Sequence, residues 1–179
     1  MSKHLHDLTV KEIRKETEEC VSVSFHIPEK FRDAFQYKAG QYLTLAATIN
    51  GEDVRRSYSL CSAPHENEWR VAIKKVPYGK FSTYANEDLR EGDTIKAFPP
   101  DGHFTISTNK NNQKHYLAFA AGSGITPMMS LVKTIMVEEP DSIFSLFYGN
   151  RNATSIIFKE QLEDLKNTYL TRFKLYHVL

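Results

Sequence analysis

The residues best suited to chemistry lie in one short run, Arg56-Ser57-Tyr58-Ser59, which continues as Leu-Cys-Ser-Ala-Pro. A guanidinium can bind a phosphate through two parallel hydrogen bonds. A tyrosine ring can pack on a flat heterocycle, and a serine hydroxyl or a backbone N–H can reach the edge of that ring. A surface strand with an incidental arginine has the same composition. The chemical interpretation is a site for a phosphorylated aromatic cofactor such as a flavin nucleotide.

A second candidate is the turn Pro-Tyr-Gly79-Lys-Phe81-Ser82-Thr83, which leads into a predicted helix over 81–88. The first N–H groups of a helix have no partner within the helix and attract phosphate, and the two hydroxyls add donors. Taken by itself, the segment is more typical of an ordinary loop and helix start.

The third candidate is the glycine turn Gly122-Ser-Gly124-Ile-Thr126-Pro127, between an apolar strand predicted at 116–120 and a helix predicted at 127–138. Glycines allow the backbone to approach a pyrophosphate, and the helix start supplies N–H donors and the positive end of a dipole. Proline is tolerated in a first helical turn. It stands where the usual dinucleotide fingerprint has its last glycine, so the ordinary Rossmann motif is not met. The strand–turn–helix context still favours a nucleotide-binding turn.

The elements that would position these motifs change character along the chain. Apolar and polar residues alternate with period two at 19–27, 43–49 and 69–73, as in half-buried strands. Asn50-Gly51 predicts a two-residue hairpin turn, because both central positions need positive φ. Many short strands with one helix indicate an antiparallel barrel or sandwich. In 69–73, Arg70 is expected on the face opposite Trp69, Val71 and Ile73.

After a polar linker at 107–114, strands and helices alternate: strand 116–120, helix 127–138, strand 143–148, helix 156–169 and a strand from residue 172. This order implies a parallel sheet. With both helices on one side, the other face of such a sheet would be open. We therefore expect either a fragment of a longer protein or a partner that covers the open face.

The three motifs, in this order and followed by Tyr148-Gly-Asn-Arg151, resemble the ferredoxin–NADP⁺ reductase superfamily, and within it the reductases that serve multicomponent oxygenases. The resemblance implies an antiparallel, Greek-key FAD-binding β-barrel at 1–108. An incomplete α/β parallel-sheet NAD(P)-binding domain would follow at 109–179.

The resemblance also implies roles for individual residues. Arg56 would hold the FAD pyrophosphate, Tyr58 would pack beside the isoalloxazine, and Ser59 would act catalytically near N5. The remaining cofactor-binding residues implied for FAD and the nicotinamide nucleotide are Ser57, Ile73, Lys74, Gly79, Phe81, Ser82, Gly122, Gly124, Thr126, Pro127 and Arg151.

The implied function is a flavin-dependent oxidoreductase that passes electrons from NAD(P)H through FAD to a one-electron acceptor. That acceptor, a ferredoxin-like domain or an oxygenase component, would lie outside this chain, in a pathway such as aromatic-compound degradation. A flavin-binding or regulatory module without turnover is the alternative. The preference between NADH and NADPH is left open.

Composition excludes several other classes. Lys and Arg total 23 against 22 Asp and Glu, a net charge of +1, which gives no general reason to expect nucleic acid. Cys20 and Cys61 are too few for an iron–sulfur cluster, the histidines have no metal-ligand spacing, and no apolar run could span a membrane. A cytoplasmic protein without resident metal is therefore expected. Glu12, Glu16 and Glu18 are expected on a solvated face.

Overall fold

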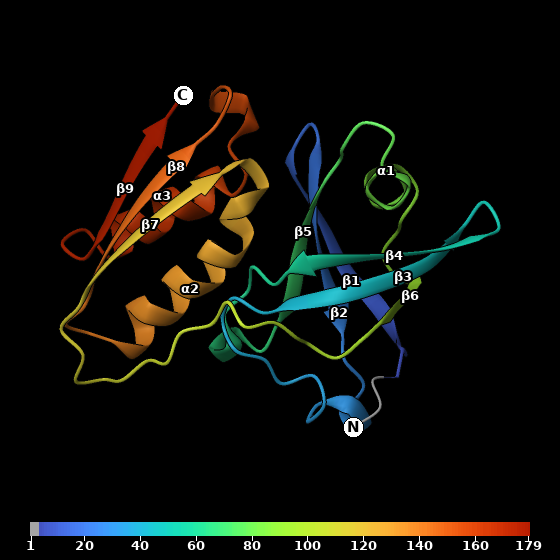
Figure 1. The fold of residues 1–179 in the computed structure, drawn as a ribbon, viewed down its shortest axis with the longest axis horizontal. Coiled ribbons are helices and arrows are strands. Elements are labelled where there is room, and N and C mark those ends of the chain that lie inside the picture. The colour runs from blue at the N-terminus through green and yellow to red at the C-terminus, as the bar shows by residue number, and fades with distance from the viewer. Residues whose placement is uncertain (1–3) are drawn as a thin grey trace.

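A computed structural model describes residues 4–179, and the strands of this part of the chain form two sheets (Figure 1). The first sheet has six antiparallel strands in the order β4-β3-β6-β1-β2-β5. Its strands are β1 (His6–Thr17), β2 (Cys20–His26), β3 (Tyr42–Ile49), β4 (Glu52–Ser59), β5 (Trp69–Lys74) and β6 (Thr94–Ala97). A bridge between Leu60 and Val71 links the two outer ends of this sheet, so the strands curl into a barrel.

The turn between β3 and β4 has the predicted hairpin geometry. Asn50 and Gly51 have φ values of 50° and 80°, the pair of positive values that a type I′ turn requires. Inward residues of the alternating strands form the barrel core, including Leu43, Leu45 and Val71. Period-two patterning therefore predicted β2, β3 and β5 and the residues that each of them turns toward the barrel core.

The connection from β5 to β6 carries the helix of the barrel and gives the sheet its Greek-key order. The chain leaves β5 at one end of the sheet, forms α1 (Lys80–Glu87) and returns as β6 between β3 and β1. Phe81 and Ala85 pack from α1 into the barrel core. The Asn86 side chain donates a 3.0 Å hydrogen bond to the carbonyl of Ile73 and so ties α1 to β5.

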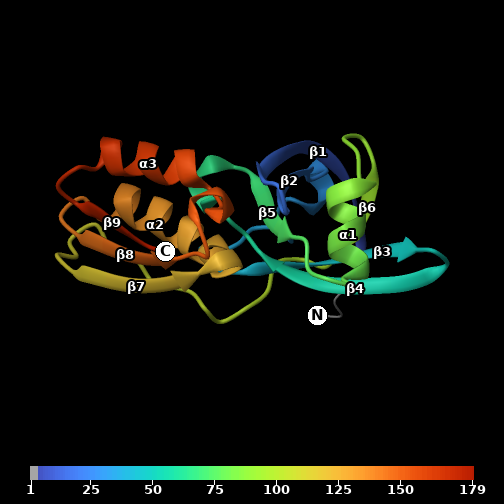
Figure 2. The same ribbon diagram turned by 90° about the horizontal axis from the view of Figure 1, so that it is seen from above.

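The second sheet is parallel, in the order β7-β8-β9. Its elements are β7 (His115–Ala121), α2 (Ile125–Glu138), β8 (Ile143–Gly149), α3 (Lys159–Thr168) and β9 (Phe173–Val178). Figure 2 shows both helices on the same side of the sheet. The prediction of a helix from residue 156 was wrong: Phe158 has φ +61°, and the helix begins at Lys159. Ile156, Ile157 and Phe158 are buried before the helix starts.

The face of the parallel sheet opposite α2 and α3 is exposed and apolar. Leu117, Phe119 and Tyr176 are 61%, 68% and 45% accessible. Phe147 stacks between Phe119 and Tyr176, with ring centroids 5.2 Å and 4.6 Å away. The open face expected from the sequence is therefore present in the described residues.

The barrel and the parallel layer meet across α2, and this contact overturns two expectations. Arg70 is buried, with Glu12 and Glu68 paired to its guanidinium. Glu16 accepts a 2.6 Å hydrogen bond from Ser22, and burial raises its pKa. The half-buried strand expected at 69–73 and the solvated position expected for Glu16 were wrong, because the outer side of β2 and β5 contributes to the apolar cluster shared with α2. The Glu12 side chain is 39% exposed, as expected for a solvated face. Glu18 is exposed as expected.

No helix within residues 4–179 is long and apolar enough to cross a membrane.

Candidate functional site

A cavity of about 320 Å³ lies where β4, β5, the start of α1 and the glycine turn before α2 meet; we call it the junction cavity. It brings the three sequence motifs together from both sheets. Its lining residues are Arg56, Ser57, Tyr58, Ser59, Ala72, Lys74, Val76, Gly79, Phe81, Ser82, Ser123 and Thr126. Nine of the fourteen predicted site residues therefore share one cavity.

Two cations line the junction cavity without a carboxylate partner among the described residues. Arg56 donates only to the neighbouring carbonyl of Arg55, at 2.6 Å, and Lys74 takes part in none of the ion pairs within residues 4–179. The adjacent lysines differ, because Lys75 pairs with Glu87 and Lys80 with Glu52. Unpaired cations attract an anionic ligand, so the charge of this cavity fits a phosphate group.

The aromatic wall of the junction cavity is Tyr58, held by packing against Phe81. Their ring centroids are 5.6 Å apart at an interplanar angle of 39°. Burial raises the pKa of the Tyr58 hydroxyl to about 12, against the smaller opposite effect of Arg56. Tyr58 is therefore neutral at physiological pH and offers an uncharged ring face and a hydroxyl to a ligand.

The turn before α1 is tightly closed and leaves the first helical N–H groups without a side-chain cap. A Cβ on Gly79 would lie 2.3 Å from the Ser82 hydroxyl oxygen and 2.5 Å from a Val76 methyl carbon. The Ser82 hydroxyl accepts from the Val76 N–H and donates to the Gly79 carbonyl. It therefore holds the turn closed, and the uncapped backbone N–H groups are the donors that remain for an anion.

The glycine turn forms a short 3₁₀ segment, Gly122–Gly124, directly before α2. Gly122 has φ +50°, a conformation that glycine adopts at little cost. Thr126 is buried, donates to the Ser123 carbonyl at 2.8 Å and lines the junction cavity. The Tyr148 hydroxyl donates to the Gly122 carbonyl at 3.0 Å and accepts from the Ile157 N–H. The tyrosine of the Tyr-Gly-Asn-Arg motif thus anchors the turn.

Five predicted residues lie outside the lining of the junction cavity: Ile73, Gly122, Gly124, Pro127 and Arg151. Ile73 has its side chain fully buried in the barrel core. Arg151 is exposed in the loop after β8. The roles proposed for these residues, like those of the nine in the cavity, remain predictions.

Sequence reasoning missed Ala72, Val76 and Ser123 as lining residues. Val76 and Ser123 lie within or beside the predicted motifs, so the motif boundaries were the available signal. Ala72 on β5 had no signal in the sequence. Among residues 4–179 there is no group of His, Cys, Asp and Glu side chains that could hold a metal ion.

Two family descriptions match the chain in the order of its two sheets. Residues 7–106 match the oxidoreductase FAD-binding domain, and residues 119–179 match the oxidoreductase NAD-binding domain. The chain therefore belongs to the FAD- and NAD-binding oxidoreductases of the ferredoxin reductase family.

Two of the curated relatives are components of oxygenase systems. The chain is 42% identical over 170 residues to a 1,2-phenylacetyl-CoA epoxidase component of Escherichia coli, covering 95% of this chain and 48% of that protein. It is 36% identical to the ferredoxin reductase component of 3-ketosteroid-9-alpha-monooxygenase of Rhodococcus rhodochrous, covering 96% and 48%. The chain thus spans about half the length of these curated relatives.

Solved structures confirm the fold. Ferredoxin-NADP⁺ reductase of Plasmodium falciparum superposes with a TM-score of 0.84 at 19% identity, covering 98% of this chain and 74% of that one. The Amycolatopsis cytochrome P450 reductase gives a TM-score of 0.81 at 22% identity, covering 100% and 53%. The barrel followed by a parallel layer, expected from the sequence, is the fold of these proteins.

Proposed function

We propose that this chain is the flavin- and nicotinamide-binding part of an NAD(P)H-dependent reductase that passes electrons to a one-electron acceptor. The observation that carries the proposal is the junction cavity, which joins the Arg-x-Tyr-Ser residues, the α1 turn and the glycine turn. The oxygenase components among the relatives support an acceptor that is an iron–sulfur centre or an oxygenase partner, in aromatic-compound degradation.

The residues around the junction cavity fit FAD in charge and shape. Arg56 and Lys74 are cations without a carboxylate partner among the described residues, and the uncapped start of α1 adds N–H donors for a pyrophosphate. A second cavity of about 520 Å³ meets the junction cavity at Gly79 and runs along the β3–β4 hairpin and α1. Tyr78 on its wall is fully exposed at φ +62°, so an aromatic ring is available there for a nucleoside.

In the proposed mechanism the chain binds the flavin and the nicotinamide, orients them and shields them, and no side chain moves a proton. Tyr58 would pack beside the ring system of the flavin, Ser59 at the end of β4 would hydrogen-bond to the edge of that ring, and Thr126 would face it from the glycine turn. FAD, when bound, supplies the conversion of a two-electron hydride into single electrons. The two walls of the junction cavity come from different sheets, so their separation determines how donor and acceptor meet.

We propose the cytoplasm as the compartment of this protein. Cys20 and Cys61 are free, buried thiols, and the reducing conditions of the cytoplasm keep thiols in this state.

The test is anaerobic titration of purified protein reconstituted with FAD. We expect the visible flavin absorbance to bleach on addition of NADH or NADPH and to return when a one-electron acceptor is added. Flavin that binds but is reduced by neither nucleotide would instead support the module without turnover. Protein that binds no flavin would contradict the proposal altogether.

A further inference from the structure

Three buried hydroxyl residues, Thr126, Ser130 and Thr134, follow one another at four-residue spacing along α2 and so lie on one face of that helix. Thr126 belongs to the junction cavity. Thr134 bonds within its own helix, to the Ser130 carbonyl at 2.8 Å. Ser130 instead reaches the barrel: its hydroxyl donates to the backbone carbonyl of Ser62 at 2.6 Å.

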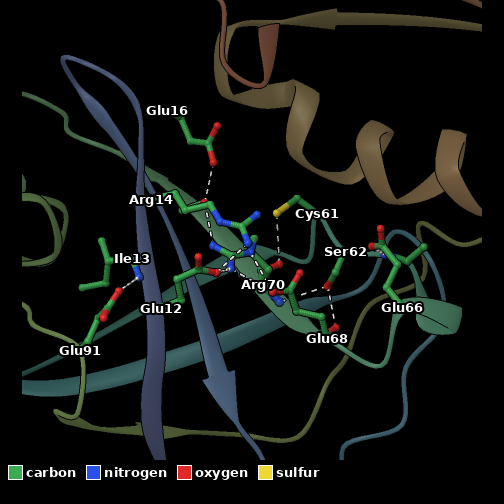
Figure 3. A network of polar contacts seen from close by, with 12 residues as sticks. Glu12, Ile13, Arg14, Glu16, Cys61, Ser62, Glu66, Glu68, Arg70 and Glu91 are labelled. Carbon is green, nitrogen blue, oxygen red and sulfur yellow. Dashed lines mark hydrogen bonds and ion pairs between the residues drawn. The ribbon is translucent and has the colours of Figure 1, made fainter. Parts of the chain in front are cut away.

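Ser62 is a fixed point of the barrel, three residues after Ser59 in the segment that leaves β4. Its hydroxyl accepts from the Arg70 N–H at 3.1 Å and from the Tyr37 hydroxyl at 2.9 Å, and donates to the Glu68 carbonyl at 2.7 Å. Figure 3 shows Ser62 beside Arg70, whose guanidinium is held by Glu12 and Glu68. The carbonyl that Ser130 binds is therefore rigidly placed.

The rest of the contact between α2 and the barrel is less directional. Met129 and Val132 belong to the same apolar cluster as Cys61 and Ala72, and apolar contacts resist separation more than sliding. Lys133 pairs with Glu66 at 3.0 Å at the margin of this contact, where solvent weakens the pair. Among the described residues, Ser130 makes the one fully buried side-chain hydrogen bond from α2 to the barrel.

We propose that Ser130 is a positioning residue, which fixes the glycine turn and Thr126 at a set distance from Ser59 across the junction cavity. The proposal rests on the proposed reductase function, since that distance matters only if a nicotinamide and a flavin meet there. Hydride transfer needs its two reacting atoms within about 3–3.5 Å, and small misplacements are costly in rate. A short bond between two buried groups is suited to holding such a separation.

The test compares Ser130→Ala with Thr134→Ala in FAD-loaded protein. Both variants remove a buried hydroxyl from the same face of α2, but only the first breaks a bond to the barrel. We expect Ser130→Ala to lower the limiting rate of flavin reduction about tenfold and the half-saturating NAD(P)H concentration to change less than about twofold. FAD affinity and the Thr134→Ala rates should remain within about twofold of the parent.

Hydrogen exchange in the flavin-free chain provides a readout that needs no activity. We expect faster exchange at residues 122–130 in Ser130→Ala and unchanged exchange in Thr134→Ala, with the barrel strands protected in both. If Ser130→Ala is too unstable to purify, Ser130→Cys keeps a weaker donor and should show an intermediate loss of rate.

The outcomes separate the two proposals. A parent chain that binds no FAD or is not reduced would reject the proposed function, while the exchange comparison still judges the Ser130 contact. A parent chain that is reduced, with Ser130→Ala matching it in rate and in exchange, would reject the positioning role alone. Equal losses in Ser130→Ala and Thr134→Ala would also reject it, because they would report general loosening of α2.

Discussion

The role of Arg56 gives the sharpest prediction, because the chain provides a matched control nearby. Arg56 lines the junction cavity and, within residues 4–179, its side chain donates only to the Arg55 carbonyl, so its guanidinium is available for a pyrophosphate. Lys75 is a cation that directly follows Lys74 in the chain, but it is paired with Glu87 and lies outside the cavity. We therefore expect Arg56→Ala to weaken FAD binding much more than Lys75→Ala does.

The expected size follows from the bonds that each residue can form. A forked guanidinium–phosphate contact comprises two charge-assisted hydrogen bonds, each contributing about 1.5–3 kcal/mol when well made. Arg56 is solvent-exposed, so we reduce this to about 2 kcal/mol in total, which corresponds to about a 30-fold rise in Kd. Lys75 should contribute less than about 0.5 kcal/mol, or about a twofold change.

The assay is titration of flavin-free protein with FAD, followed by tryptophan or flavin fluorescence, with the flavin-to-protein ratio of purified samples as a second measure. Riboflavin is the matched ligand, since it has no phosphate, and its Kd should be the same in the parent and Arg56→Ala. Equal FAD affinities for Arg56→Ala and Lys75→Ala would refute the assignment of Arg56 to the pyrophosphate. So would a loss of riboflavin affinity in Arg56→Ala as large as its loss of FAD affinity.

Three further predictions concern the groups around the site. Tyr78→Ala should lower the affinity for FAD severalfold and leave FMN binding unchanged in the same titration, because Tyr78 lines only the second cavity. Gly79→Ala should lower the unfolding free energy by about 1–3 kcal/mol in urea, since its Cβ would meet Ser82 and Val76 at under 3 Å. Burial raises the pKa of Glu139, but hydrogen bonds, first that of Ser142, outweigh it and leave this pKa lowered. Glu139 therefore stabilises the fold above pH 4.5, and the urea-midpoint deficit of Glu139→Gln at pH 7 should shrink as acidification protonates the parent carboxyl.

The fold was largely predictable because its signals are local. Alternation with period two distinguishes the faces of a strand, and the need for positive φ at Asn50 and Gly51 predicts a hairpin without knowledge of its surroundings. The start of α3 failed for the opposite reason. Ile156, Ile157 and Phe158 continue the apolar pattern of the helix, yet they are buried as an extended and turning segment before it begins.

The sequence motifs of the site could be predicted, but which side chains line the junction cavity could not. The resemblance assigned Ile73 to the cofactor, a role that stays a prediction. The period-two pattern that places Val71 in the core also directs the Ile73 side chain there. Ala72, on the opposite side of β5, lines the junction cavity instead. Local patterns give the direction of each side chain, while the second sheet, which is distant in sequence, determines whether that direction leads to solvent or to a site.

The glycine turn illustrates how such long-range placement arises. It is held from the parallel sheet by the Tyr148 hydroxyl on the Gly122 carbonyl, and from the barrel by Ser130 on the Ser62 carbonyl, through the helix that the turn begins. Each bond joins residues more than 20 positions apart, so neither has a local sequence signature. Because one bond belongs to each sheet, the turn can keep its own shape while its distance from the barrel side of the cavity depends on the contact between the sheets. Shape and distance are therefore separable by mutation, and a change in distance should alter the rate of reduction before it alters the binding of either nucleotide.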